Sequence, residues 1–535
     1  MHLHSLSRRE LLARLAAAGV LSVTPVRLLR AADSVKFRTD PFTLGVASGY
    51  PTAQAVELWT RLAPSPLAPR GGLPAEVVPV QWELATDEAC REVIRSGTAY
   101  ADPDWAHSVH VEVTGLEPAR PYWYRFVAGG ARSPVGCTRT APRRDDSVAR
   151  LRLAVASCQQ YEHGYYAAYR HMCEDELDLV VHVGDYIYEL SWGESTVRSH
   201  GAPECHTLDD YRARYALYRS DRDLQAAHAA YPWLVTWDDH EVDNDYADSV
   251  SEQDDDPYAF MARRAGAYKA WYEHMPVPRS AVPFGPHLRL YTERSYGQLV
   301  NLFMLDERQH RSPQACPPPG RRGANRVADC AELFRSERTK LGVRQEAWLD
   351  ARLEASKTRW NLLAQGTVMA YVDEQAGPGE RFWTDGWNGY PAARQRLLDS
   401  LAARRVSNPV VLSGDIHAFL AADLNQRPSD AASPIVATEF TTTSISSYGP
   451  PQKAIDERIG ENPSVRYATS EHRGYLRLDV TTDRLHAEMI GLESPRDPQS
   501  ARRTVASFAV EAGRPGVQRV ADADERQIKE PVRNA

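Results

Sequence analysis

Leu179 to Glu189 reads LVVHVGDYIYE, and this stretch decides the fold that the sequence predicts. Four of its first five residues are apolar, and Gly184-Asp185 ends the apolar run. A continuous apolar run of this length indicates a strand buried on both faces, as in a parallel sheet. Because ligands of open α/β sheets bind at the carboxyl ends of such strands, Asp185 is expected to face a site. Tyr188 follows three residues later and reaches the same point if the chain turns after the strand.

Other apolar runs repeat this pattern, and the repetition predicts an α/β domain. Polar or amphipathic stretches separate six such runs, which at this chain length favours two sheets with βα-type alternation. One run, residues 360–366, ends without a charged group. The other five end at metal-ligand or phosphate-binding residue types: Cys158, Asp185, Asp238 to His240, Asp306 with Arg308, and Asp415 with His417. One polar strand end is usually a turn residue, but five together indicate a shared site.

Composition divides the rest of the chain. Residues 36–142 carry short β-like runs separated by Pro, Gly and Asp, which predicts a separate all-β sandwich of fibronectin or immunoglobulin type, a scaffold or lid. A polar linker, APRRDDSVAR (141–150), precedes the α/β domain at residues 150–495. Residues 496–535 are charged and lack apolar periodicity beyond SFAV, so they are expected to form a loosely docked or disordered tail.

Residues 1–32 have the pattern of a twin-arginine export signal. Arg8-Arg9 precede the weakly apolar segment ARLAAAGVLSV, for which an amphipathic helix is the alternative. We expect the twin-arginine translocation machinery as a partner and a periplasmic or secreted protein. Removing this segment would change the net charge from −8 to −12, which disfavours nucleic-acid binding. No run approaches the roughly 18 apolar residues that a membrane helix needs.

The seven cysteines lack CxxC and zinc-type spacings. An odd number leaves at least one thiol unpaired, and Cys158 is expected to stay free. Cys316 and Cys330 flank a Pro/Gly/Arg-rich loop and could pair after export, although sequence does not fix connectivity.

The residue types at the strand ends point to two unlike metals. Carboxylates suit hard cations such as Ca²⁺ or Mn²⁺, whereas thiolate, phenolate and imidazole suit a transition metal such as Fe³⁺. Asp415 and His417 have i, i+2 spacing, which on an extended chain places both side chains on one face. Metals in a bimetallic hydrolytic site lie about 3.5–4 Å apart and need a bridging carboxylate. Asp185 is the expected bridge.

As a set, these motifs resemble the PhoD-like alkaline phosphatases, a branch of the calcineurin-like metallophosphoesterases. The motifs that carry the resemblance are ASCQ (156–159), GDYIYE (184–189), TWDDHEVDN (236–244), LDERQHR (305–311), SGDIH (413–417), TEFTTTSISS and HRGYLRLDVT. The export signal and the stretch FTLGVASGYP…ELWTRL are also similar to that family, so the resemblance covers nearly the whole chain. Asp-Glu-Arg at 306–308 departs slightly from the Asp-Thr-Arg often found there.

The resemblance implies hydrolysis of phosphomonoesters and phosphodiesters, with Fe³⁺ and Ca²⁺ as cofactors. Carried over motif by motif, the implied iron ligands are Cys158, Tyr188 and His417, the bridge is Asp185, and the implied calcium ligands are Asp239 and Asp415, with Asn244 as a weaker candidate.

His240 and Arg308 are the implied catalytic residues. The hypothesis is in-line attack on phosphorus by a hydroxide held between the metals, with both side chains offsetting charge on the equatorial oxygens. Arg308 resembles a bidentate phosphate clamp. His240, if protonated, would also help the leaving alkoxide depart.

Other functions stay open from the sequence. A secreted phosphodiesterase of the phospholipase D type shares this fold branch, so a lipid phosphate ester is an alternative substrate. A non-catalytic exported binding protein, in which the β-domain acts, is disfavoured by the intact ligand set. The chain has no G-x-S-x-G and no G-x-x-x-x-G-K, which disfavours a serine hydrolase and a P-loop enzyme.

Overall fold

A computed structural model describes residues 36–193 and 195–520 of the chain. The predicted export signal, residues 1–32, therefore lies outside the described residues. In the described part, no helix is both long enough and apolar enough to span a membrane.

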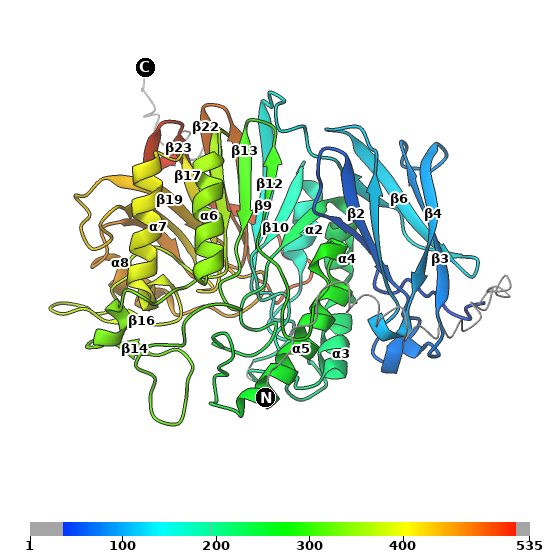
Figure 1. Cartoon of the computed structure of the whole chain (residues 1–535), viewed down its shortest axis with the longest axis horizontal. Coiled ribbons are helices and arrows are strands. Elements are labelled where there is room, and N and C mark those ends of the chain that lie inside the picture. Colours follow the sequence, from blue (N-terminus) through cyan, green and yellow to red (C-terminus); the bar gives the residue numbers. More distant parts are fainter. Residues whose placement is uncertain (1–35, 194, 521–535) are drawn as a thin grey trace, which may run out of the picture. The chain divides into compact units, whose positions relative to one another are not determined.

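Two mixed sheets lie face to face at the centre of the fold (Figure 1). The larger sheet has ten strands, of which β9, β10, β11 and β1 are mutually parallel and the rest antiparallel. In spatial order they are β24 (Arg514–Val520), β23 (Arg502–Glu511), β22 (Arg484–Leu492), β21 (Gly474–Thr481), β9 (Arg150–Ala156), β10 (Leu179–His182), β11 (Pro232–Val235), β1 (Val46–Gly49), β2 (Ala55–Arg61) and β5 (Ser108–Thr114).

The second sheet has seven strands, with a parallel centre made by β13, β15, β17 and β19. In spatial order they are β12 (Thr292–Tyr296), β13 (Val300–Met304), β15 (Trp360–Ala364), β17 (Pro409–Ser413), β19 (Ile435–Thr441), β18 (Phe419–Asn425) and β20 (Val465–Thr469). All six apolar runs of the sequence are strands, three in each sheet, which confirms the α/β, two-sheet prediction.

Helices cover the outer faces of this pair of sheets (Figure 1). On the side of the seven-stranded sheet lie α6 (Val343–Ala355), α7 (Pro391–Arg404) and the short α8 (Gln452–Ile459). On the other side lie α2 (Ala167–Glu174), α3 (Leu208–Arg219), α4 (Arg222–Ala230) and α5 (Pro257–His274). Short 3-10 turns occur at Pro69–Gly72, Pro103–Trp105, Arg279–Ala281, Ala331–Phe334 and Trp387–Gly389.

Alternating side chains of the strands build two cores. In β13, Leu302 and Met304 belong to the core between the sheets, whereas Phe303 packs in a second core with Leu349 of α6 and Leu398 of α7. This alternation is what a strand buried on both faces requires, since successive side chains point to opposite faces.

Part of the N-terminal β-region, which the sequence predicts as a separate sandwich, joins the ten-stranded sheet. Strands β1, β2 and β5 extend the ten-stranded sheet, because β1 pairs in parallel with β11. Only β4 (Val93–Ala101), β3 (Val78–Ala85), β6 (Pro121–Ala128), β7 (Ala131–Arg132) and β8 (Gly136–Arg139) form a sheet of their own. The described residues from Phe37 onward accordingly form one compact unit. The fibronectin likeness stays a prediction.

The prediction of a loosely docked or disordered tail is wrong over residues 502–520, which form β23 and β24. Phe508 and Val510 enter the core, and β23 pairs with β22 along its length. The polar side chains of these strands face away from the core, so the sequence shows only the short apolar run SFAV. The rest of the predicted tail, residues 521–535, lies outside the described residues.

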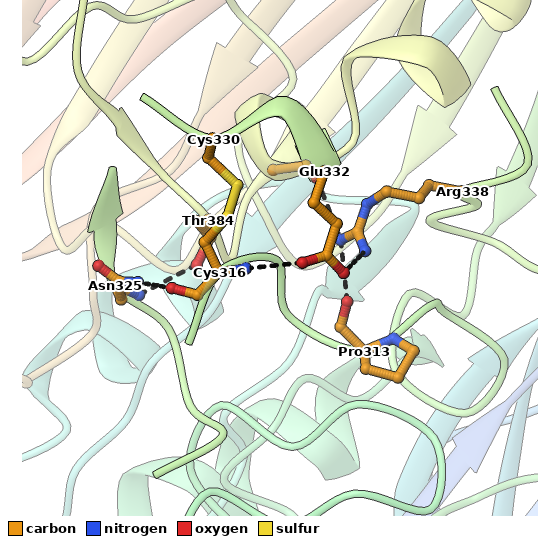
Figure 2. Close-up of a disulfide and its surroundings, with 8 residues drawn as sticks. Pro313, Cys316, Asn325, Cys330, Glu332, Arg338 and Thr384 are labelled. Atoms are coloured by element: carbon orange, nitrogen blue, oxygen red, sulfur yellow. Dashed lines mark hydrogen bonds and ion pairs between the residues drawn. A yellow bond between two sulfur atoms is a disulfide. The ribbon is translucent and has the colours of Figure 1, made fainter. Parts of the chain in front are cut away.

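A disulfide joins Cys316 to Cys330, as the sequence allowed (Figure 2). It closes a loop that contains β14 (Arg326–Val327), which pairs with β16 (Phe382–Trp383) in a small ribbon. The backbone N–H of Asn325 donates to the hydroxyl of Thr384. Thr384 precedes Asp385, a carboxylate of the site described below. Cys158 is free, as expected.

Candidate functional site

The ends of parallel strands from both sheets meet at one site. Residues after β9, β10 and β17 bring Cys158, Asp185 and His417 together, and one ligand atom from each lies within 4.8 Å of the others. Residues after β11 add Asp239 and His240, which form a second group with Asp185 under the same limit. Asp185 is therefore the member shared by two groups of metal-ligand side chains. This is the position expected of a bridge.

The turns that carry these side chains have unusual backbone conformations. Cys158, Asp185, Asp415 and His417 have φ of 56°, 56°, 67° and 52°, in the left-handed region that non-glycine residues rarely adopt. Such conformations cost roughly 1–3 kcal/mol each and cluster at functional sites. Gly184 is required here because its φ is 123° and an added Cβ would lie 2.5 Å from Cβ of Asp238.

Glu241 holds the ends of β10 and β11 together. Its carboxylate accepts the backbone N–H of Asp185 (3.2 Å), Tyr186 (2.6 Å) and Asp238 (2.9 Å). Burial raises the pKa of Glu241 to about 8, although these three N–H groups favour the anion. The contacts fix the direction in which Asp185 leaves its strand.

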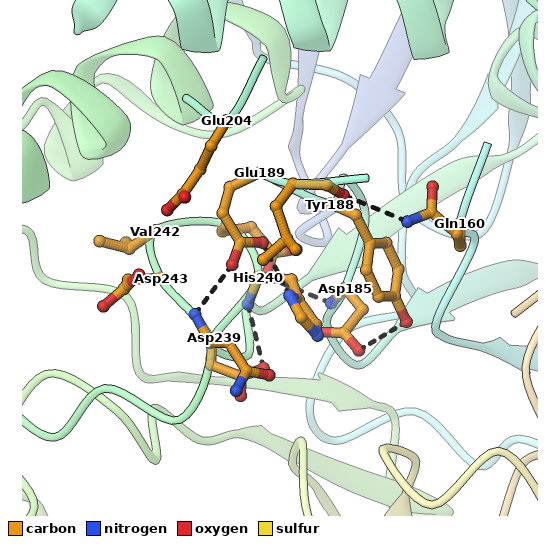
Figure 3. Close-up of polar contacts among 12 residues, drawn as sticks. Gln160, Asp185, Tyr188, Glu189, Glu204, Asp239, His240, Val242 and Asp243 are labelled. Atoms are coloured by element: carbon orange, nitrogen blue, oxygen red, sulfur yellow. Dashed lines mark hydrogen bonds and ion pairs between the residues drawn. The ribbon is translucent and has the colours of Figure 1, made fainter. Parts of the chain in front are cut away.

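Tyr188 lies between Asp185 and His417. Its Oη donates to Oδ2 of Asp185 at 3.0 Å (Figure 3), and it lies 3.1 Å from Nε2 of His417 and 2.9 Å from Oγ of Ser447. Nδ1 of His417 donates to the carbonyl oxygen of Tyr448 at 2.5 Å, so Nε2 faces the site. The other oxygen of Asp185, Oδ1, is buried and has no hydrogen-bond partner among the described residues.

Burial disfavours every anion in this group. Desolvation is the largest cause that raises the pKa of Cys158, Tyr188 and Asp185. Repulsion from Asp185 adds to it for Cys158 and Tyr188, whereas for Asp185 the charge of His240 opposes it and repulsion from Asp239 adds to it. Desolvation also lowers the pKa of His417 to about 3, so its imidazole is neutral. A neutral imidazole and buried acids with one unsatisfied carboxylate oxygen fit a cation that would stabilise the anions. The sulfur, phenol and imidazole donors fit a transition metal.

His240 is held as a cation by carboxylates. Its Nδ1 lies 2.7 Å from Oε2 of Glu189, which is fully buried (Figure 3), and its ring stacks on Tyr188 at 4.1 Å. Burial opposes the charge, but Glu189, Asp239 and Asp185 outweigh it and raise the pKa of His240 well above its usual value. A protonated imidazole can donate a proton through Nε2.

Asp239 and Asp415 are the two carboxylates predicted for the calcium side of the site. Asp239 accepts the backbone N–H of His240 (3.0 Å) and of Asp245 (2.7 Å). Burial raises the pKa of Asp239, but Arg308 and His240 outweigh it, so the net direction is downward. Burial, with repulsion from Asp238, raises the pKa of Asp415 well above its usual value.

Asn244 points elsewhere. Its side-chain amide donates to Glu252 at 2.8 Å, and its backbone N–H donates to Glu189 at 2.9 Å. Its backbone N–H thus supports Glu189, the partner of His240, and its amide nitrogen is engaged with Glu252.

Arg308 occupies a different place from the one predicted. Its guanidinium is 0% exposed and makes a bidentate pair with Asp385 at 2.8 and 2.7 Å. Nε binds Asp238, and Nη2 lies 3.5 Å from Asp239. All its donor nitrogens face carboxylates of the chain, so Arg308 neutralises these acids and does not present an open phosphate clamp.

Sequence reasoning missed Asp385, Asp245, Glu189 and Glu241 as parts of this site. Asp385 also accepts from Arg311 and Gln314, both at 2.7 Å. Asp239, Asp245 and Asp385 gather within 4.8 Å, with Arg308 as their counter-ion. Glu189 and Glu241 belong to the motifs GDYIYE and DDHE, so their place in these motifs was a signal that could have identified them. Asp385 follows no apolar strand run, so no local signal marks it.

A small apolar cavity of about 110 Å³ adjoins Asp415. Its walls include Val372, Ile416, Leu420, Ile455 and Val465. The charged residues at its rim, Arg458 and Glu374, neutralise each other at 3.2 Å. An uncharged, hydrocarbon group fits this lining.

Comparisons with known proteins identify the family of this fold and sequence. Residues 153–489 match the family model described as PhoD-like phosphatase, and residues 29–142 match the model of the PhoD-like phosphatase N-terminal domain. The chain is 44% identical over 492 residues to alkaline phosphatase D of Bacillus subtilis (strain 168), which covers 90% of this chain and 83% of that protein. A solved structure described as the structure of PhoD has a TM-score of 0.88 at 44% identity, covering 91% of this chain and 94% of that one.

Proposed function

The chain belongs to the PhoD-like phosphatase family and is a phosphoric ester hydrolase, and we propose that it cleaves both phosphomonoesters and phosphodiesters at a two-metal centre. The observation that carries the two-metal proposal is Asp185, which is shared by two groups of metal-ligand side chains and keeps a buried oxygen without a protein partner.

The donor types support Fe³⁺ and Ca²⁺ as cofactors. Cys158, Tyr188 and His417 would hold iron, with Asp185 as the bridge. Asp239, which gathers with Asp185, would hold calcium, and Asp415, whose pKa burial and repulsion from Asp238 raise strongly, would join it. Asn244 is left out of this set because its amide binds Glu252. When bound, such a pair supplies Lewis acidity and a nucleophile at neutral pH.

The chain's own residues move the proton and fix the carboxylates. His240, held as a cation by Glu189, would donate from Nε2 to the oxygen of the leaving group. Arg308 would act as a positioning residue, because its pairs with Asp385, Asp238 and Asp239 set the direction of these acids.

Metal-dependent hydrolysis is tested by turnover and metal content together. Purified protein should contain iron and calcium and hydrolyse 4-nitrophenyl phosphate and bis(4-nitrophenyl) phosphate. Chelation should abolish both activities, and the two metals together should restore them. Asp185→Asn should lose both metals, whereas Asp430→Asn, at an exposed position, should keep them. Full activity in metal-free protein would contradict the proposal.

Export by the twin-arginine machinery remains part of the proposal, with a periplasmic or secreted location. The Cys316–Cys330 disulfide supports it, since disulfides persist in oxidising compartments. Replacing Arg8 and Arg9 with Lys should leave the protein in the cytoplasmic fraction; normal export of this variant would exclude the signal.

The apolar cavity next to Asp415 favours a second candidate, a lipid phosphodiester of the kind that phospholipases D cleave. Ala468→Phe would fill the cavity. If a hydrocarbon chain binds there, this variant should lose hydrolysis of phosphatidylcholine and keep hydrolysis of the nitrophenyl esters. Equal rates on both substrate types before and after the change would exclude this candidate.

A further inference from the structure

Trp192 is an exposed aromatic side chain that contacts the site. It lies in the segment that follows β10, three residues after Glu189, and 38% of it is exposed. Its ring centroid lies 5.3 Å from that of Tyr188 and 5.5 Å from that of His240, both edge to face. His417 lies 6.1 Å away. Among the exposed aromatic side chains of the described residues, it is the one whose ring neighbours are the proposed site residues.

A second aromatic pair continues this surface. His163 lies 5.6 Å from Trp192 and stacks on Tyr448 at 4.0 Å with an interplanar angle of 14°. The carbonyl oxygen of Tyr448 accepts from Nδ1 of His417, which ties this pair to the site. We call Trp192 and the buried His163 the aromatic wall; Trp192 is its exposed member and contacts His240.

The position of the aromatic wall next to His240 indicates which part of a bound ester it would contact. The ring of Trp192 contacts Tyr188 and the imidazole of His240, so the organic group of an ester bound at these residues must lie within a few ångströms of the indole. Trp192 packs against the same imidazole with part of its ring open. Flat aromatic groups bind such a ring by stacking or edge contact.

We propose that Trp192 is a specificity-determining residue that binds the leaving group, and that the enzyme favours phosphate esters with a flat aromatic or heteroaromatic leaving group. This inference rests on the proposed function. It adds a subsite for the group that departs, on the His240 side, whereas the apolar cavity lies on the Asp415 side.

The effect of the indole ring is measured with two esters and two variants. In Trp192→Ala, KM for phenyl phosphate should rise about 3- to 10-fold, which corresponds to the loss of one aromatic contact. KM for glycerol phosphate should change less than about 2-fold, and kcat for both esters should stay near the wild-type value. Trp192→Phe should restore most of the affinity for the phenyl ester. Phe284→Ala, at an exposed aromatic position outside the wall, is the matched control.

Inhibition separates binding from catalysis. Phenylphosphonate should bind Trp192→Ala about 3- to 10-fold more weakly, while inorganic phosphate should bind equally to both proteins. Equal losses for the phenyl and glycerol esters, or weaker binding of inorganic phosphate, would mean that Trp192 only packs the site, and would overturn the inference. Wild-type protein that hydrolyses neither ester would overturn the proposed function, and the inference with it.

Discussion

Replacing Asp385 with Asn should destabilise the protein strongly, because this carboxylate neutralises two buried arginines. Oδ1 accepts from Arg308 (2.8 Å), Arg311 (2.7 Å) and Gln314 (2.7 Å), and Oδ2 accepts from Arg308 at 2.7 Å. Both arginine side chains are 0% exposed. In Asp385→Asn the amide oxygen can serve only one of the two oxygen positions. The other position would turn an N–H₂ group toward Nη2 of Arg308, donor against donor.

The expected magnitude follows from the burial of this pair. Removing one partner of a buried ion pair costs about 3–5 kcal/mol, because the remaining charge cannot reach water. An entropy of unfolding of about 2.1 cal/mol/K per residue gives about 1.1 kcal/mol/K for 535 residues. The melting temperature should therefore fall by about 3–5 °C.

Scanning calorimetry on the wild type, Asp385→Asn and Asp430→Asn tests this prediction. The control variant breaks an exposed pair with Arg427, whose side chain is 66% exposed against 40% for Asp430. Such a pair contributes less than about 1 kcal/mol, so the control should shift by no more than about 1 °C. A fall in Asp385→Asn no larger than in the control would refute the reasoning that this cluster depends on Asp385.

Three further predictions address the metal, the pH response and the disulfide. Tyr188→Phe should remove the visible charge-transfer band expected of a phenolate on Fe³⁺; a spectrum that does not change would exclude Tyr188 as an iron ligand. Burial, with repulsion from Glu112, raises the pKa of Glu57 from 4.5 to about 8, so its neutral form favours the fold below about pH 4.5 and this contribution is lost as the pH rises toward 8. Glu57→Gln should therefore raise the melting temperature by up to about 4 °C at pH 8.5 and leave it unchanged at pH 4.5, and equal shifts at both pH values would contradict the burial argument. Replacing Cys316 and Cys330 with Ser should lower the melting temperature by about 3 °C, as should a reductant acting on the wild type, because the bond closes a loop with a sequence separation of 14; a further effect of the reductant on the double variant would point to another cause.

The parallel strands and the side chains at their ends could be predicted from the sequence. Apolar runs that stop at Cys158, Asp185 or Asp415 are local patterns. The apolar residues that indicate a buried strand and the polar residue that follows the strand lie within about ten positions of each other. Such patterns predicted that these side chains would meet, because parallel strands end at a common edge. They also supplied the donor types on which the metal proposal rests.

Which distant segments complete the sheets and the site could not be predicted from the sequence and is seen in the tertiary structure. Pairing of β1 with β11, and of β23 with β22, makes one large sheet from segments that the sequence separates into a domain and a tail. Arg308 binds Asp385, 77 positions away, instead of an open phosphate site. Trp192 lies in a loop whose sequence has no helix or strand periodicity, yet its ring contacts His240. All three have the same cause. Hydrogen bonds between strands, ion pairs and ring contacts join residues that are distant in sequence and close in space, and the local sequence pattern around each residue carries no information about its distant partner.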